Sequence, residues 1–99
     1  MEVRGVGVDT QGRCVHWHSR VDVAANTCGA CRELWACSLC HAALADHPFA
    51  PVGREERSVL CGACGAMLTH AEYATGACPA CGHGFNPGCK AHEDVYFRA

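Results

Sequence analysis

The residues from Cys28 to His47 constrain this chain more than any other stretch, because they hold four cysteines and two histidines. Two C-x2-C pairs follow one another here, and that spacing lets two thiolates of one tight turn reach a single tetrahedral metal ion. His41 follows Cys40 directly, and adjacent residues of a turn rarely converge on one ion. We therefore expect Cys40 and His41 to serve different metal sites, whose ligands must alternate along the chain.

Metal ions, and not disulfides, are expected to bridge the cysteines. The chain has ten cysteines, but it shows no secretory signal, so an oxidising compartment is not expected. Most of the seven histidines lie close to a cysteine in sequence, which disulfides would not require. The apolar fraction of 49% includes the cysteines, so the apolar core of these 99 residues is thin. A small chain with a thin core needs cross-links, and we expect metal ions to supply them.

A C-x-H unit precedes the two pairs. In an extended segment, residues two apart share one face, so Cys14 and His16 can reach the same ion. His18 shares that face and is the alternative ligand. We expect His18 instead to be solvated or to lie outside the ligand shell.

The second half contains two C-x2-C-G turns, CGACG at 61–65 and CPACG at 78–82, which are typical of a zinc ribbon. The glycine of each turn is expected at positive φ, with its N–H facing a sulfur. Farther on, Cys89 and His92 stand at i and i+3 of a predicted helical turn and could hold a fourth metal. They lack enough further ligands, since only His18 and His83 are left over, so we expect no fourth site.

We expect a small metal-stabilised α+β fold of short strands and helical turns, in one domain over residues 1–99. Strands are predicted at 2–8, 21–24, 32–36 and 58–60, with a helix over 41–47 ended by Pro48. A capping box from Thr69 to Glu72 predicts a helical turn at 70–75, which leaves His70 exposed. Residues 48–57 are predicted to connect a first lobe, about 1–50 with two metals, to a second lobe, about 58–97 with one. Val95 and Phe97 are predicted to pack on residues 3–8.

Together these motifs resemble the small stand-alone form of the CHY-type zinc finger over residues 4–97. Trp17 stands where the family usually has tyrosine, and many members have two adjacent cysteines where this chain has Cys28 and Cys31. The resemblance implies three structural zinc ions held by twelve ligands. Relatives of this type include a RING-type ubiquitin ligase and a small protein of the mitochondrial intermembrane space. The latter handles zinc in the oxidative import of small chaperone subunits. This sequence matches only the CHY part, so ligase activity is not implied.

The spacing arguments group the expected ligands into three sites, of which the first two are cross-braced. The first site comprises Cys14, His16, Cys37 and Cys40, the second Cys28, Cys31, His41 and His47, and the third Cys61, Cys64, Cys78 and Cys81. Zn²⁺ suits such thiolate and imidazole sets, because it accepts both ligands in tetrahedral geometry without redox demands. Iron is the alternative at the third site, because its second turn also resembles rubredoxin.

Two functions fit this pattern. We expect a non-catalytic protein-interaction module, because twelve ligands for three zinc ions leave no open coordination position for enzyme chemistry. The alternative is a zinc- or thiol-handling helper for the folding or import of other cysteine-rich proteins, which requires one site that releases metal readily. The site with His41 and His47 is the predicted labile one, because imidazoles protonate at mildly acid pH.

The charge argues against nucleic acid as the partner. The formal net charge is −2, and nine thiolates binding three divalent ions lower it to about −5. The eight lysines and arginines are spread along the chain without a cluster, so no phosphate-binding stripe is expected. We expect another protein as the partner, no membrane, a monomeric state and a cytoplasmic location.

Overall fold

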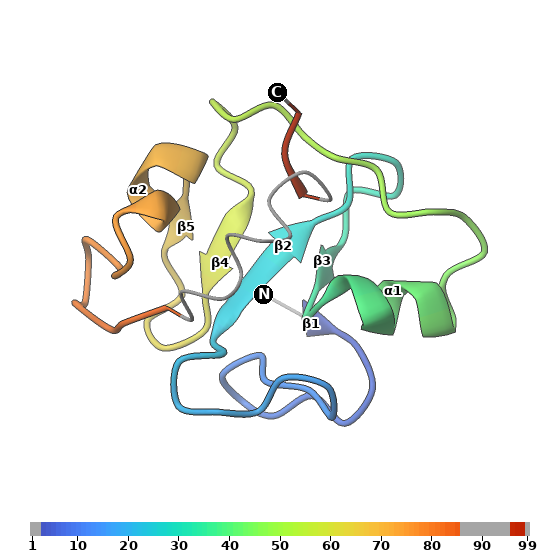
Figure 1. Ribbon diagram of the computed structural model, residues 1–99, viewed down its shortest axis with the longest axis horizontal. Coiled ribbons are helices and arrows are strands. Elements are labelled where there is room, and N and C mark those ends of the chain that lie inside the picture. The colour runs from blue at the N-terminus through green and yellow to red at the C-terminus, as the bar shows by residue number, and fades with distance from the viewer. Residues whose placement is uncertain (1–2, 86–95, 99) are drawn as a thin grey trace.

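The computed structural model describes residues 3–85 and 96–98, and its centre is a mixed sheet of five short strands (Figure 1). The strands are β1 (Val3–Arg4), β2 (Ala24–Thr27), β3 (Leu34–Trp35), β4 (Val59–Cys61) and β5 (Met67–Leu68). They lie in the order β1-β3-β2-β4-β5, with β1 parallel to β3 and the other neighbours antiparallel. Helix α1 (Ser38–Leu44) lies beside β1 and β3, and helix α2 (His70–Ala74) lies beside β5. The predicted small α+β fold is confirmed. Within the described residues, neither helix is long and apolar enough to cross a membrane.

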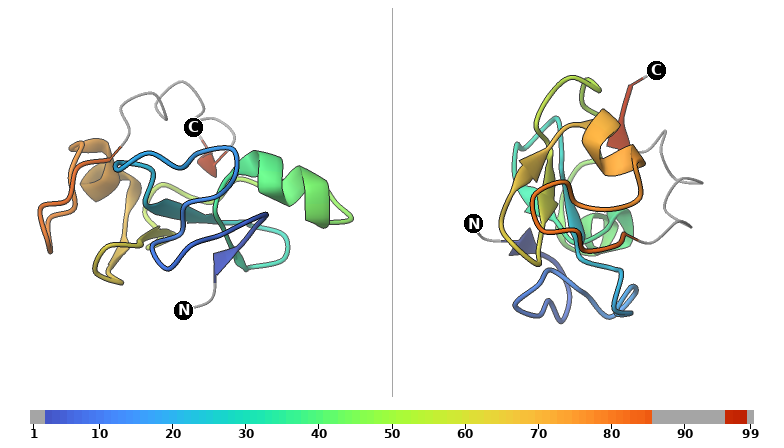
Figure 2. Two further views of the ribbon diagram at one scale, coloured as in Figure 1. Left: turned by 90° about the horizontal axis from the view of Figure 1, so that it is seen from below. Right: turned by 90° about the vertical axis from the view of Figure 1, so that its left-hand side faces the viewer.

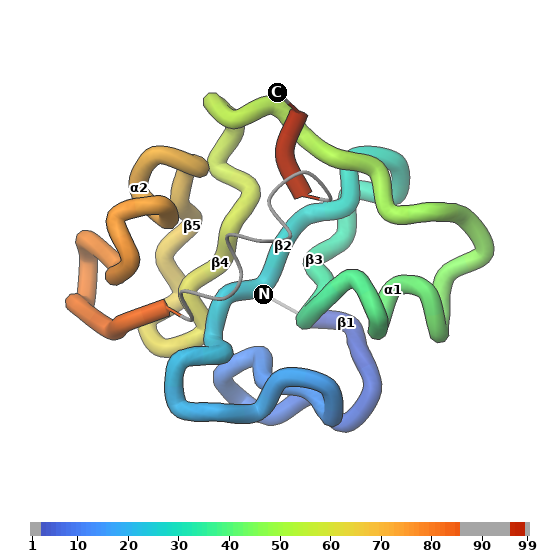
Figure 3. The backbone as a smooth tube through the Cα atoms, viewed as in Figure 1, coloured from blue at the N-terminus to red at the C-terminus, as the bar shows by residue number. Residues whose placement is uncertain are grey.

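Strand β2 joins the two halves of the chain. It pairs with β3 on one side and with β4 on the other, where Ala25 is the partner of Leu60. The two predicted lobes therefore share one sheet. The 48–57 connection runs across one end of this sheet from α1 toward β4 (Figure 3). Along this connection Val52 forms a parallel bridge with Phe97. Phe97 therefore pairs with Val52, and the prediction that it packs on residues 3–8 is wrong; Val95 lies outside the described residues.

The interior is built from small clusters that include cysteines. Side chains of β4 alternate between the two faces of the sheet: Val59 and Cys61 join the largest cluster, while Leu60 faces Ala25 and Leu34. The largest cluster comprises Val23, Val52, Val59, Cys61, Leu68, Cys78, Phe85 and Phe97. A second cluster packs Trp35 among four buried cysteines. The thiols are thus part of the core, as the shortage of large apolar residues requires.

Both helices begin at side-chain caps. The sulfur of Cys37 caps α1 by accepting a hydrogen bond from the Cys40 N–H at 3.4 Å. The helix therefore begins earlier than predicted, and it ends at Leu44, because Ala45 is extended. Helix α2 has the predicted capping box, in which the Thr69 and Glu72 side chains each accept from the other residue's backbone N–H.

Of the two strands before the first cysteine pair, one is shorter than predicted and the other is shifted along the chain. Strand β1 covers only Val3–Arg4, the two residues that pair with β3, and farther on Gly7 at φ 65° turns the chain away from extended geometry. The long loop that follows lies at one end of the sheet, opposite the 48–57 connection (Figure 1), and reaches β2, which begins at Ala24 and not at Val21. This loop carries Cys14 and His16, so their predicted extended segment is wrong.

Candidate metal centres

The structure gathers twelve cysteine and histidine side chains into three groups of four. Within each group all four donor atoms lie within 4.8 Å of one another. The groups are Cys14, His16, Cys37 and Cys40; Cys28, Cys31, His41 and His47; and Cys61, Cys64, Cys78 and Cys81. These are the sets that the sequence predicts as sites, and the first two alternate along the chain. We call them the first, second and third clusters.

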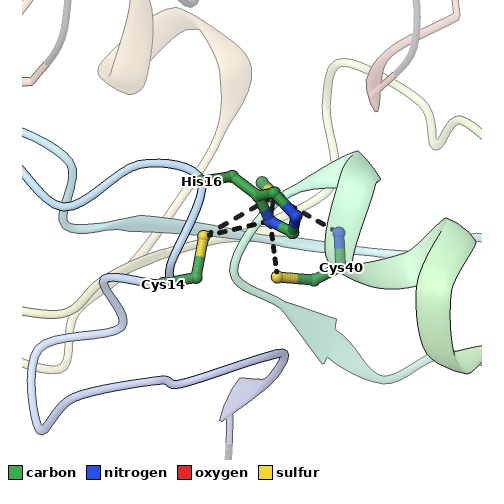
Figure 4. Close-up of side chains that lie close together, drawn as sticks. Cys14, His16 and Cys40 are labelled. Atoms are coloured by element: carbon green, nitrogen blue, oxygen red, sulfur yellow. Dashed lines mark hydrogen bonds between the residues drawn. The ribbon is translucent and has the colours of Figure 1, made fainter.

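The first cluster lies between the long N-terminal loop and the start of α1 (Figure 4). The Nδ1 atom of His16 lies 3.8 Å from the sulfur of Cys14 and 3.4 Å from the sulfurs of Cys37 and Cys40. The backbone N–H of Val6 donates to the Cys40 sulfur at 3.3 Å. All three cysteines are buried, and His16 is the exposed member.

The second cluster combines the turn after β2 with α1 and the residues that follow it. Because α1 ends at Leu44, His47 can fold back until its Nε2 atom lies 3.2 Å from the Nε2 of His41. The same atom of His47 lies 3.7 Å from the Cys28 sulfur. His41 is buried and packs edge-on against Trp35 and Phe49, with ring centroids 4.7 and 5.1 Å away.

The third cluster joins the two C-x2-C-G turns. The sulfurs of Cys61 and Cys81 are 3.8 Å apart, and those of Cys64 and Cys78 are 3.7 Å apart. Gly65 and Gly82 have φ values of 84° and 78°, as predicted. Their N–H groups, however, donate to the carbonyl oxygens of Cys61 and Cys78 at 2.7 Å, so the prediction that they face sulfur is wrong.

The donor distances match the edges of a tetrahedron around a metal ion. Metal–sulfur bonds of about 2.3 Å and metal–nitrogen bonds of about 2.05 Å give edges of about 3.8 Å (S–S), 3.6 Å (S–N) and 3.3 Å (N–N). The shortest observed S–S and N–N distances, 3.6 Å between Cys14 and Cys37 and 3.2 Å between His41 and His47, agree with these edges. A disulfide would need sulfurs about 2.05 Å apart, and the nine described cysteines are free. Each cluster therefore fits a tetrahedral ion.

The second cluster also favours the thiolate form that binds metal. Burial by itself would raise the pKa of Cys28, but hydrogen bonds from backbone N–H groups, led by that of Ala50, and from His47 lower it to about 6. In turn Asp46 first, then Cys28 and Cys31, raise the pKa of His47 to about 9. The metal-free pair thus resembles a thiolate beside an imidazolium, and metal binding displaces the imidazolium proton.

At other sulfurs, burial and hydrogen bonds from backbone N–H groups shift the thiol pKa in opposite directions. Desolvation raises the pKa of Cys37 and of Cys61 to about 12, despite backbone N–H groups that lower it. At Cys78 burial again raises the pKa, but the N–H groups of Cys81 and Ala80 outweigh it and lower the pKa to about 7. Metal binding therefore releases protons from the buried thiols of the first and third clusters.

Outer contacts of the second cluster escaped the sequence analysis. The Asp46 carboxylate lies 2.9 Å from Nδ1 of His47, which leaves Nε2 directed into the cluster. The Trp35 Nε1–H donates to the Cys31 sulfur at 3.4 Å, and the Ala50 N–H donates to Cys28 at 3.5 Å. Of these contacts, only that of Asp46 had a signal in the sequence, because Asp46 directly precedes the predicted ligand His47.

The substitution Asp46→Asn is expected to weaken metal binding at the second cluster about tenfold, because carboxylates that orient a ligating histidine typically contribute that much. Competition with a chromogenic chelator, followed ion by ion, measures the change. Glu55→Gln, which removes an exposed carboxylate elsewhere, is the matched control. Equal affinities of the two variants would contradict this role for Asp46.

Among the described residues, His18, His70 and His83 lie outside the three clusters. His18 is exposed, and Nε2 of His83 lies 2.8 Å from the Arg20 carbonyl oxygen. His70 is half-buried and not exposed, because its ring packs on Phe97 with centroids 4.7 Å apart. Cys89 and His92, the pair considered for a fourth site, lie outside the described residues.

Comparisons with known proteins find relatives that span nearly the whole chain. An uncharacterized protein of Schizosaccharomyces pombe is 46% identical over 99 residues, which cover 96% of this chain and 88% of that protein. Helper of Tim protein 13 of Saccharomyces cerevisiae is 38% identical over 104 residues, covering 97% and 90%. The protein of that name from Kluyveromyces lactis is 37% identical over 100 residues, covering 97% and 88%. No family model and no solved structure matches, so the CHY type stays a prediction. The chain belongs to the family of Helper of Tim protein 13.

Proposed function

We propose that this protein binds three zinc ions and acts as a zinc- or thiol-handling helper in the folding or import of other cysteine-rich proteins. The observation that carries the proposal is the name of two relatives, which describes helpers of another protein. The three clusters of metal-binding side chains supply a means of giving that help. The proposal favours the helper function over the interaction module that the sequence analysis ranked first.

The donor chemistry supports zinc. The first cluster carries three thiolates and one imidazole, the second two of each, and the third four thiolates, at distances that suit a tetrahedral ion. Zn²⁺ takes such mixed sets and needs no change of oxidation state. Iron suits only the all-thiolate third cluster. Each cluster offers four protein donors, which supports a role without catalysis, because a tetrahedral ion then has no open position for a substrate.

Help of this kind proceeds by ligand exchange. A thiolate of the partner forms a bond to zinc as one ligand of the helper leaves, and the thiol proton of the partner passes to solvent or to the leaving group. Zinc remains Zn²⁺, so no electrons are transferred. The reaction is reversible and runs toward whichever protein binds zinc more tightly. The monomeric state and the cytoplasmic location stay predictions.

A transfer experiment tests this function. Protein purified without added zinc is expected to carry three zinc ions per chain by elemental analysis. On incubation with a reduced, metal-free synthetic peptide that has two C-x2-C pairs, about one ion should move to the peptide while the protein stays folded. The same peptide with serine in place of cysteine is the control. If zinc leaves only on unfolding, and all three ions together, the protein is a structural interaction module instead.

A further inference from the structure

We propose that metal passes between this protein and its cysteine-rich partners at the third cluster, through the sulfurs of Cys64 and Cys81, while the first and second clusters keep their ions. This inference rests on the proposed function. It differs from the sequence analysis, which predicted the cluster of His41 and His47 as the labile one.

Exposure of the ligands distinguishes the third cluster. Among the nine cysteines that the structure describes, Cys64 and Cys81 are the exposed ones, while Cys31 is half-buried and the other six are buried. A Cβ atom added at Gly65 or Gly82, the residues directly after them, would meet nothing within 4 Å. Figure 2 shows the loop of residues 78–82 projecting at the end of the molecule away from α1. Solvent and partners thus have access to one edge of this cluster.

The other two clusters present no such edge. The first cluster exposes only the imidazole of His16, and its three sulfurs are buried. In the second cluster Cys28 and His41 are buried, Cys31 and His47 are half-buried, and the Trp35 and Phe49 rings cover His41. A Cβ atom added at Gly29, in the turn between Cys28 and Cys31, would lie 2.6 Å from the Pro51 carbonyl oxygen, which shows how closely the chain encloses that turn.

Exposed sulfurs matter because an incoming thiolate must reach the metal while the leaving one is still bound. At the third cluster a bond forms between the metal and a partner thiolate, the bond to Cys64 or Cys81 breaks, and the freed thiolate enters solvent. No atom changes oxidation state. A partner with two C-x2-C pairs also offers four thiolates, the same ligand set as the third cluster. Exchange is therefore closely balanced and can run in either direction.

The ligand sets make each cluster separately observable. Loaded with cadmium-113, the protein should give three NMR signals, because the cadmium shift depends on the number of thiolate ligands, and the clusters have three, two and four. The reduced peptide with two C-x2-C pairs is then added. We expect the signal of the four-thiolate cluster to decay first, while the other two persist. Earlier loss of the two-thiolate or three-thiolate signal, or parallel loss of all three, would overturn the inference and leave the helper function intact. If no cadmium reaches the peptide, both proposals fail.

Introducing a positive or a negative charge beside the third cluster tests the route without removing a ligand. Ala80 is an exposed residue of the turn between Cys78 and Cys81. Ala80→Lys should raise the rate of transfer about threefold at low salt, and Ala80→Glu should lower it about threefold, because the arriving thiolates are anionic. Both differences should vanish at high salt. The matched pair is Ala42→Lys and Ala42→Glu at an exposed position of α1, next to His41 in the second cluster. A rate that follows the charge at residue 42 and not at residue 80 would overturn the inference.

Discussion

Removal of the metal ions is expected to unfold the whole protein. Each structural zinc contributes roughly 10–16 kcal/mol of apparent binding free energy, whereas a small domain is stable by only about 5–15 kcal/mol in total. The core cannot replace that contribution, because six of its buried side chains are cysteines of the three clusters and the fully buried His41 is a seventh cluster member. Without metal, these side chains would be crowded together in the core with no ion to bridge them.

Circular dichroism and NMR before and after exhaustive treatment with a strong chelator, under reducing conditions, measure this effect. We expect loss of secondary structure and of shift dispersion, and recovery of both when three equivalents of zinc are returned. A chain that stays folded after all metal has been removed, or mass spectra showing paired sulfurs, would contradict metal as the element that holds the fold.

The substitution Gly62→Ala is expected to lower the free energy of unfolding by about 3 kcal/mol or more, because the added methyl group has no room. Its Cβ would lie 1.8 Å from the Gln11 carbonyl oxygen and 2.8 Å from that of Val23. Both are backbone atoms, so the loop and the end of β4 would have to separate. The Gly62 N–H donates to Val23 at 2.7 Å, and this hydrogen bond would be lost with the separation.

Denaturation of the zinc-loaded variant in urea, with excess zinc present, gives the change in free energy. Gly65→Ala is the matched control in the same turn: its φ of 84° disfavours alanine, but nothing lies within 4 Å of the added Cβ. That variant should lose only about 1–2 kcal/mol, the cost of a left-handed residue. Equal losses at both positions would contradict close approach as the reason that Gly62 is necessary.

Local features were predictable from the sequence. The C-x2-C turns bring their own two sulfurs together, so the pairs at 61–64 and 78–81 needed no knowledge of the fold. The capping box of Thr69 and Glu72 is likewise a contact within four residues, and the structure shows it as predicted. The adjacency of Cys40 and His41 correctly indicated that the first two clusters alternate along the chain.

Features that depend on distant segments were not predictable. The end of β1 was misplaced, because its pairing with the distant strand β3 decides it. The pairing of Phe97 with Val52 joins segments far apart in the chain, and no short pattern encodes it.

The sequence by itself determined which side chains could hold metal and how they divide into three sets, because ligand type and spacing are properties of short segments. Only the tertiary structure decided which donors face solvent. Strand β2 pairs with both β3 and β4, and the packed chain buries nine of the twelve donor residues wholly or in part. Cys64, Cys81 and His16 are the exposed ones. Exposure is a property of the whole packed chain. Two C-x2-C motifs can therefore look alike in sequence although one lies in an enclosed site and the other in an open one.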